Sequence, residues 1–370
     1  MQELFNNNKI KMFFIYLYRQ NKLFGGEDMK KFLERVPLFF AFVVFLAFAL
    51  CLSSSYAASI MGDVGLASRE IVGGDEPLKE IGATFQESLP IDTEKKEETQ
   101  TVSASPSDAI GQIYEQFLSP YSAKLKYDGV YIKNSTGLNI DLASELATPP
   151  KIKLEQNDKP QVLIIHTHAT ESYMPEDRNF YTAADASRST DNSKNMIMVG
   201  EAFAEAIRKG GISVIHDTTQ HDHPSYTGSY SKAYNTISEY LKKYPSIKIV
   251  VDVHRDAVST NGGKIKPTVK IDGQKAAQVM LVVGSETGSV TNFPNWKENF
   301  RLAVRFHQAM EKTYPGLART MLFSSSRYNM HLTTGSMLLE VGTDANTLDE
   351  ACYSARLAGT ALLSVLNGLR

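Results

Sequence analysis

The sequence predicts an α/β protein with three layers, in which a mostly parallel, twisted sheet is flanked by helices and preceded by a transmembrane helix and a flexible tether. Three observations lead to this prediction. Short apolar runs that suit buried strands alternate with amphipathic segments between residues 158 and 370. An uncharged apolar run lies near the N-terminus, and a polar stretch separates the two regions.

The composition limits the class of protein. The 370 residues are 22% charged and 42% hydrophobic with a net charge of −2, which is typical of a globular chain and excludes a wholly disordered or collagen-like one. The near-neutral balance provides no basic field, so no nucleic-acid partner is expected. The only cysteines are Cys51 and Cys352, so any metal would need His and carboxylate ligands.

Residues 37–60 carry no charge and are just long enough to span a bilayer as a single-pass anchor. Lys30, Lys31 and Arg35 precede this run, and the next basic residue is Arg69. The asymmetry predicts that residues 1–36 are cytoplasmic and that the rest of the chain is extracytoplasmic.

Two alternatives remain open at the N-terminus. Residues 55–58 resemble a small-residue cleavage site, which would make the run a cleaved signal peptide. The run Met29-Lys30-Lys31 has the character of a natural start, so residues 1–28 can be a mis-annotated extension.

Residues 61–108 are polar and poor in aromatics, so we expect a flexible tether. Residues 109–157 form a small segment beside the catalytic domain. Within it Ile110, Ile113, Tyr114 and Phe117 recur at helical spacing, and residues 130–132 are typical of a strand.

Residues 158–370 are expected to form the catalytic domain. A hairpin is expected around Asp272-Gly273, between strands at 264–271 and 276–283. Further strands are expected at 161–165, 212–216, 247–253 and 337–341, and helices at 195–209, 230–244, 294–314 and 347–366.

Three polar clusters follow or end these strands, at residues 166–172, at residues 252–256 and at Glu340. The carboxyl ends of parallel strands meet at one edge of a sheet, so these clusters can share one crevice. Two His and one carboxylate around an open position is a common catalytic zinc arrangement. A further carboxylate outside the metal shell can then act as a general base.

His168 and His254 are the predicted imidazole ligands, and Glu171 is the predicted carboxylate ligand. Glu340 is the predicted base, because it is a lone acid in an apolar strand and burial would raise its pKa. Each has a structural alternative: Glu171 can cap a turn, and Glu340 can pair with Arg255. His166 is either a satisfied core residue or one that orients the ligands.

Other polar residues are weaker candidates. The run His221-Asp222-His223 lies in a polar loop and is expected on the surface. Tyr226 and Tyr230 could stack on sugars, although packing is the default. Arg178 and Arg188 could bind an anionic substrate.

At residues 165–173 the sequence resembles a known family. Together with residues 251–256, residues 335–342 and the anchor plus tether, the run His166-Thr167-His168-Ala169-Thr170-Glu171-Ser172 resembles the stage II sporulation protein P family of zinc-dependent N-acetylmuramoyl-L-alanine amidases. The resemblance covers residues 158–370 closely.

The resemblance implies hydrolysis of the peptidoglycan amide between N-acetylmuramic acid and L-alanine, with associated cleavage of peptide cross-links. It implies action with stage II sporulation proteins D and M at the sporulation septum, where wall thinning permits engulfment. It also implies zinc ligands at His168 and His254, a catalytic Glu340, and an oxyanion stabilised by zinc with Arg255 or a loop N–H.

There is one departure from the wider amidase family, in which a Glu ligand opens the helix after the first strand. Here that helix opens with Ser193-Lys194-Asn195. The carboxylate ligand is therefore assigned to Glu171, with Asp191 or His166 as alternatives.

Two other functions fit part of this pattern. A His-x-His pair after a strand also begins a class of metal-dependent phosphoesterases, but that class adds more His and Asp at later strand ends. A degenerate, wall-binding amidase would not need Glu340.

Overall fold

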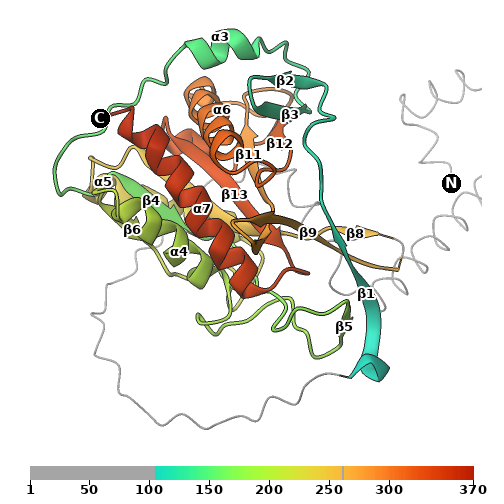
Figure 1. The fold of residues 1–370 in the computed structure, drawn as a ribbon. Coiled ribbons are helices and arrows are strands. Elements are labelled where there is room, and N and C mark those ends of the chain that lie inside the picture. Colours follow the sequence, from blue (N-terminus) through green and yellow to red (C-terminus); the bar gives the residue numbers. More distant parts are fainter. Residues whose placement is uncertain (1–104, 261) are drawn as a thin grey trace, which may run out of the picture. The chain divides into compact units, whose positions relative to one another are not determined.

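The computed structural model describes residues 105–260 and 262–370, which form two sheets and their covering helices (Figure 1). The larger sheet has the strand order β2-β3-β12-β11-β13-β7-β4-β6. Its strands are β2 (Leu125–Tyr127), β3 (Val130–Asn134), β12 (Met321–Ser324), β11 (Val279–Gly284), β13 (Ser336–Thr343), β7 (Ile249–Asp256), β4 (Val162–Ile165) and β6 (Val214–His216).

Most neighbouring strands of the larger sheet are parallel. β13, β7, β4 and β6 run parallel to one another, as do β3, β12 and β11. Only the β2–β3 and β11–β13 pairs are antiparallel. The predicted mostly parallel sheet is therefore confirmed.

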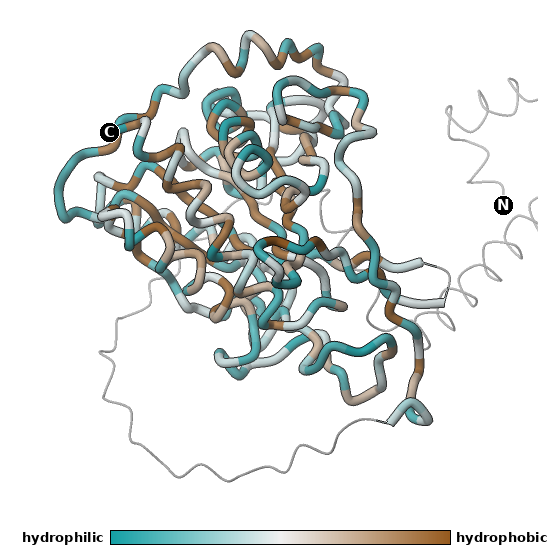
Figure 2. Tube along the Cα trace, viewed as in Figure 1, coloured by the Kyte–Doolittle hydropathy of each residue, from teal (hydrophilic) through white to brown (hydrophobic). Residues whose placement is uncertain are grey.

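Helices cover both faces of this sheet. α4 (Met196–Arg208), α6 (Trp296–Thr313) and α7 (Leu348–Asn367) pack on one face, where Ile164, Val251 and Leu339 join their apolar sides in the main core. α5 (Ser229–Lys243) covers the other face over Leu163, Ile165 and Val250. The three predicted layers are present, and Figure 2 shows the hydrophobic residues concentrated along these strands and helices.

Local signals explain where the helices begin. Asn195 caps α4 by accepting a hydrogen bond from the N–H of Ile197. Thr347 and Glu350 form a reciprocal capping box at the start of α7. α5 starts after Gly228, whose φ of 82° suits a residue without a side chain.

The smaller sheet corrects one prediction. β1 (Ala109–Gln116) is a strand, not the helix suggested by the spacing of its apolar residues. It pairs in parallel with β9 (Gly263–Ile271) and antiparallel with β5 (Phe180–Thr182). These long-range partners supply ladder hydrogen bonds that override a weak local period.

The predicted hairpin is confirmed in its first half and wrong in its second. β9 and β10 (Gln274–Ala277) pair around Asp272-Gly273, where both residues have positive φ. At Gln278 the chain leaves this sheet and enters β11 of the larger one. The side chain of Gln278 is buried and bonds to Leu118 and Gly316, which fixes the crossing point.

The segment at residues 109–157 is joined to both sheets. β1 lies in the smaller sheet and β3 pairs with β12 in the larger one. The short helix α3 (Leu142–Ala147) follows, and two 3-10 turns, η2 (Pro106–Asp108) and η3 (Met330–Leu332), and the short β8 (Ser259–Thr260) complete the fold.

The predicted cytoplasmic segment, the membrane run at 37–60 and nearly all of the tether lie outside the described residues. In the part of the chain that is described, no helix is both long enough and apolar enough to cross a membrane.

Candidate active site

The three predicted clusters meet at the carboxyl ends of β4, β7 and β13. Register pairs Ile165 with Asp252 and His254 with Glu340, so the ends of these strands lie side by side. Side chains alternate between the faces of a strand. Because Val250 and Leu338 face away from the main core, Asp252, His254 and Glu340 project on that same side, which α5 covers.

The loop after β4 carries His168 and Glu171 and is fastened by buried hydrogen bonds. The N–H and hydroxyl of Thr170 both donate to the buried carboxylate of Asp222. The N–H of Thr167 donates to Asp252 at 2.8 Å. The loop is therefore tied to β7 and to the loop after β6, which limits how far either candidate ligand can move.

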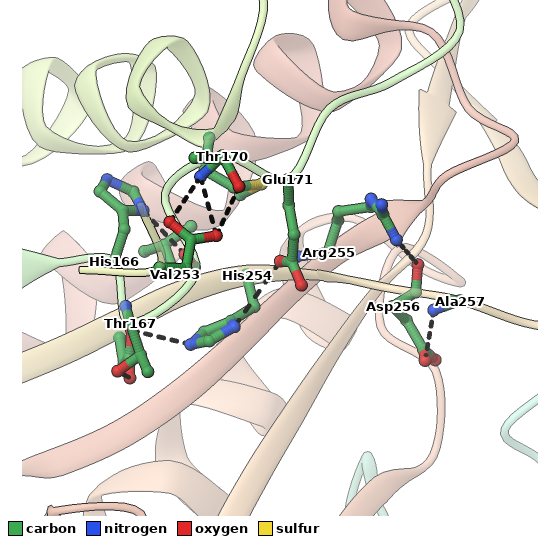
Figure 3. Close-up of polar contacts among 12 residues, drawn as sticks. His166, Thr167, Thr170, Glu171, Val253, His254, Arg255, Asp256 and Ala257 are labelled. Atoms are coloured by element: carbon green, nitrogen blue, oxygen red, sulfur yellow. Dashed lines mark hydrogen bonds and ion pairs between the residues drawn. The ribbon is translucent and has the colours of Figure 1, made fainter. Parts of the chain in front are cut away.

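His254 lies between two carboxylates. Its Nε2 is 2.8 Å from Oδ1 of Asp252, in a contact that is not aligned as a hydrogen bond, and its Nδ1 is 3.7 Å from Oε2 of Glu171. Burial would lower the pKa of His254, but Asp252 first and Glu171 second outweigh it and raise the pKa well above its usual value. Figure 3 shows the Glu171 carboxylate beside the imidazole of His254.

The carboxylates respond in the opposite direction. Burial would raise the pKa of Glu171, but His254 and then Arg255 outweigh it, so the pKa of Glu171 is lowered. For Asp252, burial is likewise outweighed by His254 and the hydrogen bonds from Thr167, and the pKa is lowered to about 2. Both groups are thus anionic at neutral pH, which favours a cation at this place.

His168 is the second imidazole of the site. Its ring centroid is 5.3 Å from that of His254, with the planes nearly perpendicular. Its Nδ1 is buried and has no hydrogen-bond partner, and burial lowers the pKa of His168 to about 4. Tyr226 stacks on the ring at 4.5 Å, and Tyr230 meets it edge-on at 5.7 Å.

Glu340 stands beside His254 on the next strand. Part of its side chain is exposed, but Oε2 is buried without a hydrogen-bond partner. Burial and then the charge of Asp256 raise the pKa of Glu340 to about 8. A carboxyl group with a raised pKa, held next to a cationic site, is suited to accept and return a proton.

The types of side chain gathered here suit a zinc ion, although their present positions do not form a complete coordination site. As they stand, no group of three or more His, Cys, Asp or Glu within residues 105–260 and 262–370 is arranged to hold a metal. The chemistry of the set is nevertheless that of a catalytic zinc site: two imidazoles, each with a buried nitrogen that has no hydrogen-bond partner, and the anionic Glu171. His168, Glu171 and His254 are the residues that would hold it.

The two alternative ligands lie in other surroundings. His166 is fully buried: its Nδ1 donates to the carbonyl of Val253 at 2.8 Å, and its Nε2 is 2.9 Å from Nε2 of His216. Asp191 is half-exposed and bonds only within its own loop, to Ser193 and Lys194. His166 therefore supports the backbone just before His254, and Asp191 has no contact with either candidate imidazole.

Arg255 is placed differently from its expected role. It follows His254 on β7 and so points to the opposite face, and Figure 3 shows its side chain turned away from the imidazole. Its guanidinium donates to the carbonyls of Ser172 at 3.0 Å and Ser187 at 2.6 Å, while its backbone N–H donates to Glu171. These contacts hold the loop that carries Glu171 and leave no guanidinium contact with Glu340 in the described structure.

The sequence analysis missed one supporting group, Asp252, and misplaced two others, His221 and Asp222. Asp252 orients His254, and its position two residues before a His on one strand was a usable signal. The expectation that residues 221–223 lie on the surface is wrong for His221 and Asp222, which are buried; only His223 is exposed. His221 bonds to the carbonyl of His166 and to Thr236. The partners of His221 and Asp222 are distant in sequence, so the polarity of the local sequence does not predict their burial.

Comparison with known proteins identifies relatives of this chain. The family model described as stage II sporulation protein P matches residues 74–362. Stage II sporulation protein P of Bacillus subtilis (strain 168) is 31% identical over 222 residues, which are 57% of this chain and 51% of that protein. The chain thus spans about half the length of this curated relative.

Two solved structures are also similar. N-acetylmuramoyl-L-alanine amidase AmiC2 of Nostoc punctiforme matches with a TM-score of 0.34 and 11% identity, over 56% of this chain and 97% of that one. The CwlD amidase from Clostridioides difficile, solved in complex with the GerS lipoprotein, matches with a TM-score of 0.35 and 10% identity, over 56% and 98%.

Proposed function

Because this chain belongs to the stage II sporulation protein P family, we propose that it is a peptidoglycan hydrolase of sporulating cells. Its reaction is hydrolysis of the amide between N-acetylmuramic acid and L-alanine. The observation that supports this most strongly is the convergence of His168, His254 and Glu171 beside Glu340, whose buried Oε2 has no partner.

The metal in this proposal is zinc, held by His168, Glu171 and His254. When bound, it would polarise the scissile carbonyl and lower the pKa of the attacking water. Asp252 keeps the His254 ring oriented, and the Thr170–Asp222 hydrogen bonds keep Glu171 in place.

Glu340 carries the proton through the reaction. Its carboxylate accepts a proton as the water oxygen bonds to the carbonyl carbon, and the carbonyl oxygen becomes an oxyanion. As the C–N bond then breaks, Glu340 returns that proton to the departing amine of L-alanine. The Glu340 side chain acts first as a base and then as an acid, so its removal prevents both the attack of water and the departure of the amine.

A Glu340→Gln substitution tests this role. Purified sacculi treated with the wild-type chain should gain free L-alanine amines without new reducing ends, and the variant should release none. Zinc content of the variant, measured by elemental analysis, should match the wild type, because Glu340 is not a ligand. Unchanged turnover in the variant removes Glu340 from the mechanism. New reducing ends would instead indicate cleavage of glycan.

The phosphoesterase alternative gains no support from the site. It needs His166 as a ligand, and both ring nitrogens of His166 are engaged with Val253 and His216. Cleavage of peptide cross-links remains a proposal of the same kind as the amidase reaction, and muropeptide digestion separates the two by the bond that is opened.

We also propose the cellular setting. The chain is anchored by residues 37–60 with its catalytic domain extracytoplasmic at the sporulation septum, in a complex with stage II sporulation proteins D and M. Protease treatment of intact protoplasts tests the orientation, since an extracytoplasmic domain is digested and a cytoplasmic one is protected. Co-purification of the three proteins from sporulating cells tests the complex.

A further inference from the structure

The amide hydrolysis proposed above creates a negative charge on the carbonyl oxygen, and a hydrogen-bond donor aimed at that oxygen accelerates such reactions. The sequence suggested Arg255 for this task. Its guanidinium is engaged with the carbonyls of Ser172 and Ser187, and it lies on the other face of β7 from His254. A donor on the α5 face is therefore needed.

Tyr230 is on that face. It is the second residue of α5, and its ring meets the edge of the His168 imidazole at 5.7 Å with an interplanar angle of 89°. The ring of Tyr328 also packs near it, with the two ring centroids 6.1 Å apart. The Tyr230 side chain thus contacts both a candidate zinc ligand and the loop before η3.

The backbone around Tyr230 is held in place. The side-chain amide of Asn329 donates to the carbonyl of Tyr230 at 2.8 Å. Tyr328 and Asn329 both have positive φ, 44° and 57°, a conformation that costs free energy for non-glycine residues. The loop therefore holds two residues in a strained conformation where it contacts the first turn of α5, and such strain is typical of functional sites.

The hydroxyl of Tyr230 is available to a ligand. It makes no hydrogen bond to any residue within 105–260 and 262–370, so its O–H is left to donate. Burial and then the charges of Asp252, Glu340 and Glu171 raise the pKa of this phenol, which agrees with the ring contact to His168 in putting Tyr230 within electrostatic range of these groups. A phenol is protonated at neutral pH and can donate.

We propose that Tyr230 is a further catalytic residue, whose hydroxyl donates a hydrogen bond to the carbonyl oxygen of the scissile amide as that oxygen becomes negative. This inference rests on the proposed amidase reaction. No proton leaves Tyr230: water adds its oxygen to the carbonyl carbon, Glu340 takes the water proton, and Tyr230 only shares its own with the oxyanion.

The test compares Tyr230→Phe with Tyr234→Phe in the full chain. Tyr234 lies one turn further along α5 and stacks on His331, which is no candidate site residue, so Tyr234→Phe is a matched loss of one hydroxyl. With a soluble glycan-linked stem peptide, Tyr230→Phe should lower kcat by about 10²-fold with KM within about threefold. Tyr234→Phe should leave both constants unchanged.

Two further readouts separate catalysis from structure. Zinc content and Tm of Tyr230→Phe should equal those of the wild type. A phosphinate analogue, which resembles the tetrahedral oxyanion, should bind the variant about 10²-fold more weakly, while a product-like peptide with a free L-alanine amine binds equally.

Three outcomes overturn the inference. A kcat of Tyr230→Phe within threefold of the wild type does so, as does a loss confined to KM, or a loss matched by lost zinc. In each case an active wild type and an inactive Glu340→Gln leave the proposed function standing. If the wild type does not cleave the amide at all, the proposed function and this inference fail together.

Discussion

Replacing Asp252 with Asn should weaken zinc binding without unfolding the protein. The buried carboxylate of Asp252 accepts from the N–H of Thr167 at 2.8 Å and from its hydroxyl at 2.6 Å, and it lies 2.8 Å from Nε2 of His254. Asn has the same shape and can keep a hydrogen bond from Thr167, but it cannot place a negative charge against the imidazole.

The expected size follows from the role of Asp252 as the group behind a ligand. Loss of such a carboxylate partner typically lowers metal affinity by about 10- to 100-fold. That corresponds to about 1.4–2.8 kcal/mol. Zinc affinity is measured at constant pH by competition with a chromophoric chelator, and Tm of the metal-free proteins reports on folding.

Asp217→Asn is the matched control. Asp217, which follows β6, is also a buried carboxylate, but its partners are Thr219 and Tyr240 rather than a candidate ligand. Its substitution should change zinc affinity by less than about twofold. If Asp252→Asn also binds zinc within twofold of the wild type while keeping its Tm, then either Asp252 does not support His254 or His254 is not a ligand.

Two other predictions concern groups around the site. Arg255→Lys should lower the free energy of unfolding by about 1–3 kcal/mol, because a Lys cannot bond to the carbonyls of both Ser172 and Ser187; a variant with unchanged stability but lost kcat would restore Arg255 to a catalytic role. Burial lowers the pKa of His166 to about 3. Between about pH 6.5 and 3 the unfolded chain therefore binds one more proton than the folded chain. His166 thus lowers the free energy of unfolding by up to about 1.4 kcal/mol for each pH unit below 6.5. Glu340, with its raised pKa, stabilises the fold as the pH falls, so the effect of His166 is isolated by comparing the wild type with His166→Gln. In urea unfolding of the metal-free proteins, the wild type should lose more stability than the variant from pH 7 to pH 5. Equal losses would contradict a buried neutral imidazole at His166.

The central strands could be predicted because their sequences are dictated by burial. β4, β7 and β13 are apolar runs, and a sheet covered on both faces leaves few other choices. The polar residues that interrupt or follow these runs were then the natural candidates, and His168, Glu171, His254 and Glu340 do converge.

Other features depend on partners that the local sequence does not reveal. β1 became a strand because β5 and β9 lie on either side of it, and Gln278 divides a predicted arm because its amide is bound by Leu118 and Gly316. Burial of Asp222 comes from Thr170, 52 residues earlier in the chain.

The expected oxyanion role of Arg255 was wrong for a different reason. Strand alternation alone puts it opposite to His254, so the sequence contained the information that its side chain faces away from the site. By the two-residue period of β7, an oxyanion donor near His254 is expected on the face that α5 covers.

Diffraction at the zinc absorption edge, from crystals of the zinc-loaded protein, tests the central claim most directly. We expect one anomalous peak whose protein ligands are His168, Glu171 and His254, with the carboxylate of Glu340 nearby but unbound. A peak held by Asp191 or His166, or imidazoles of His168 and His254 that do not share the ion, would contradict the proposed site.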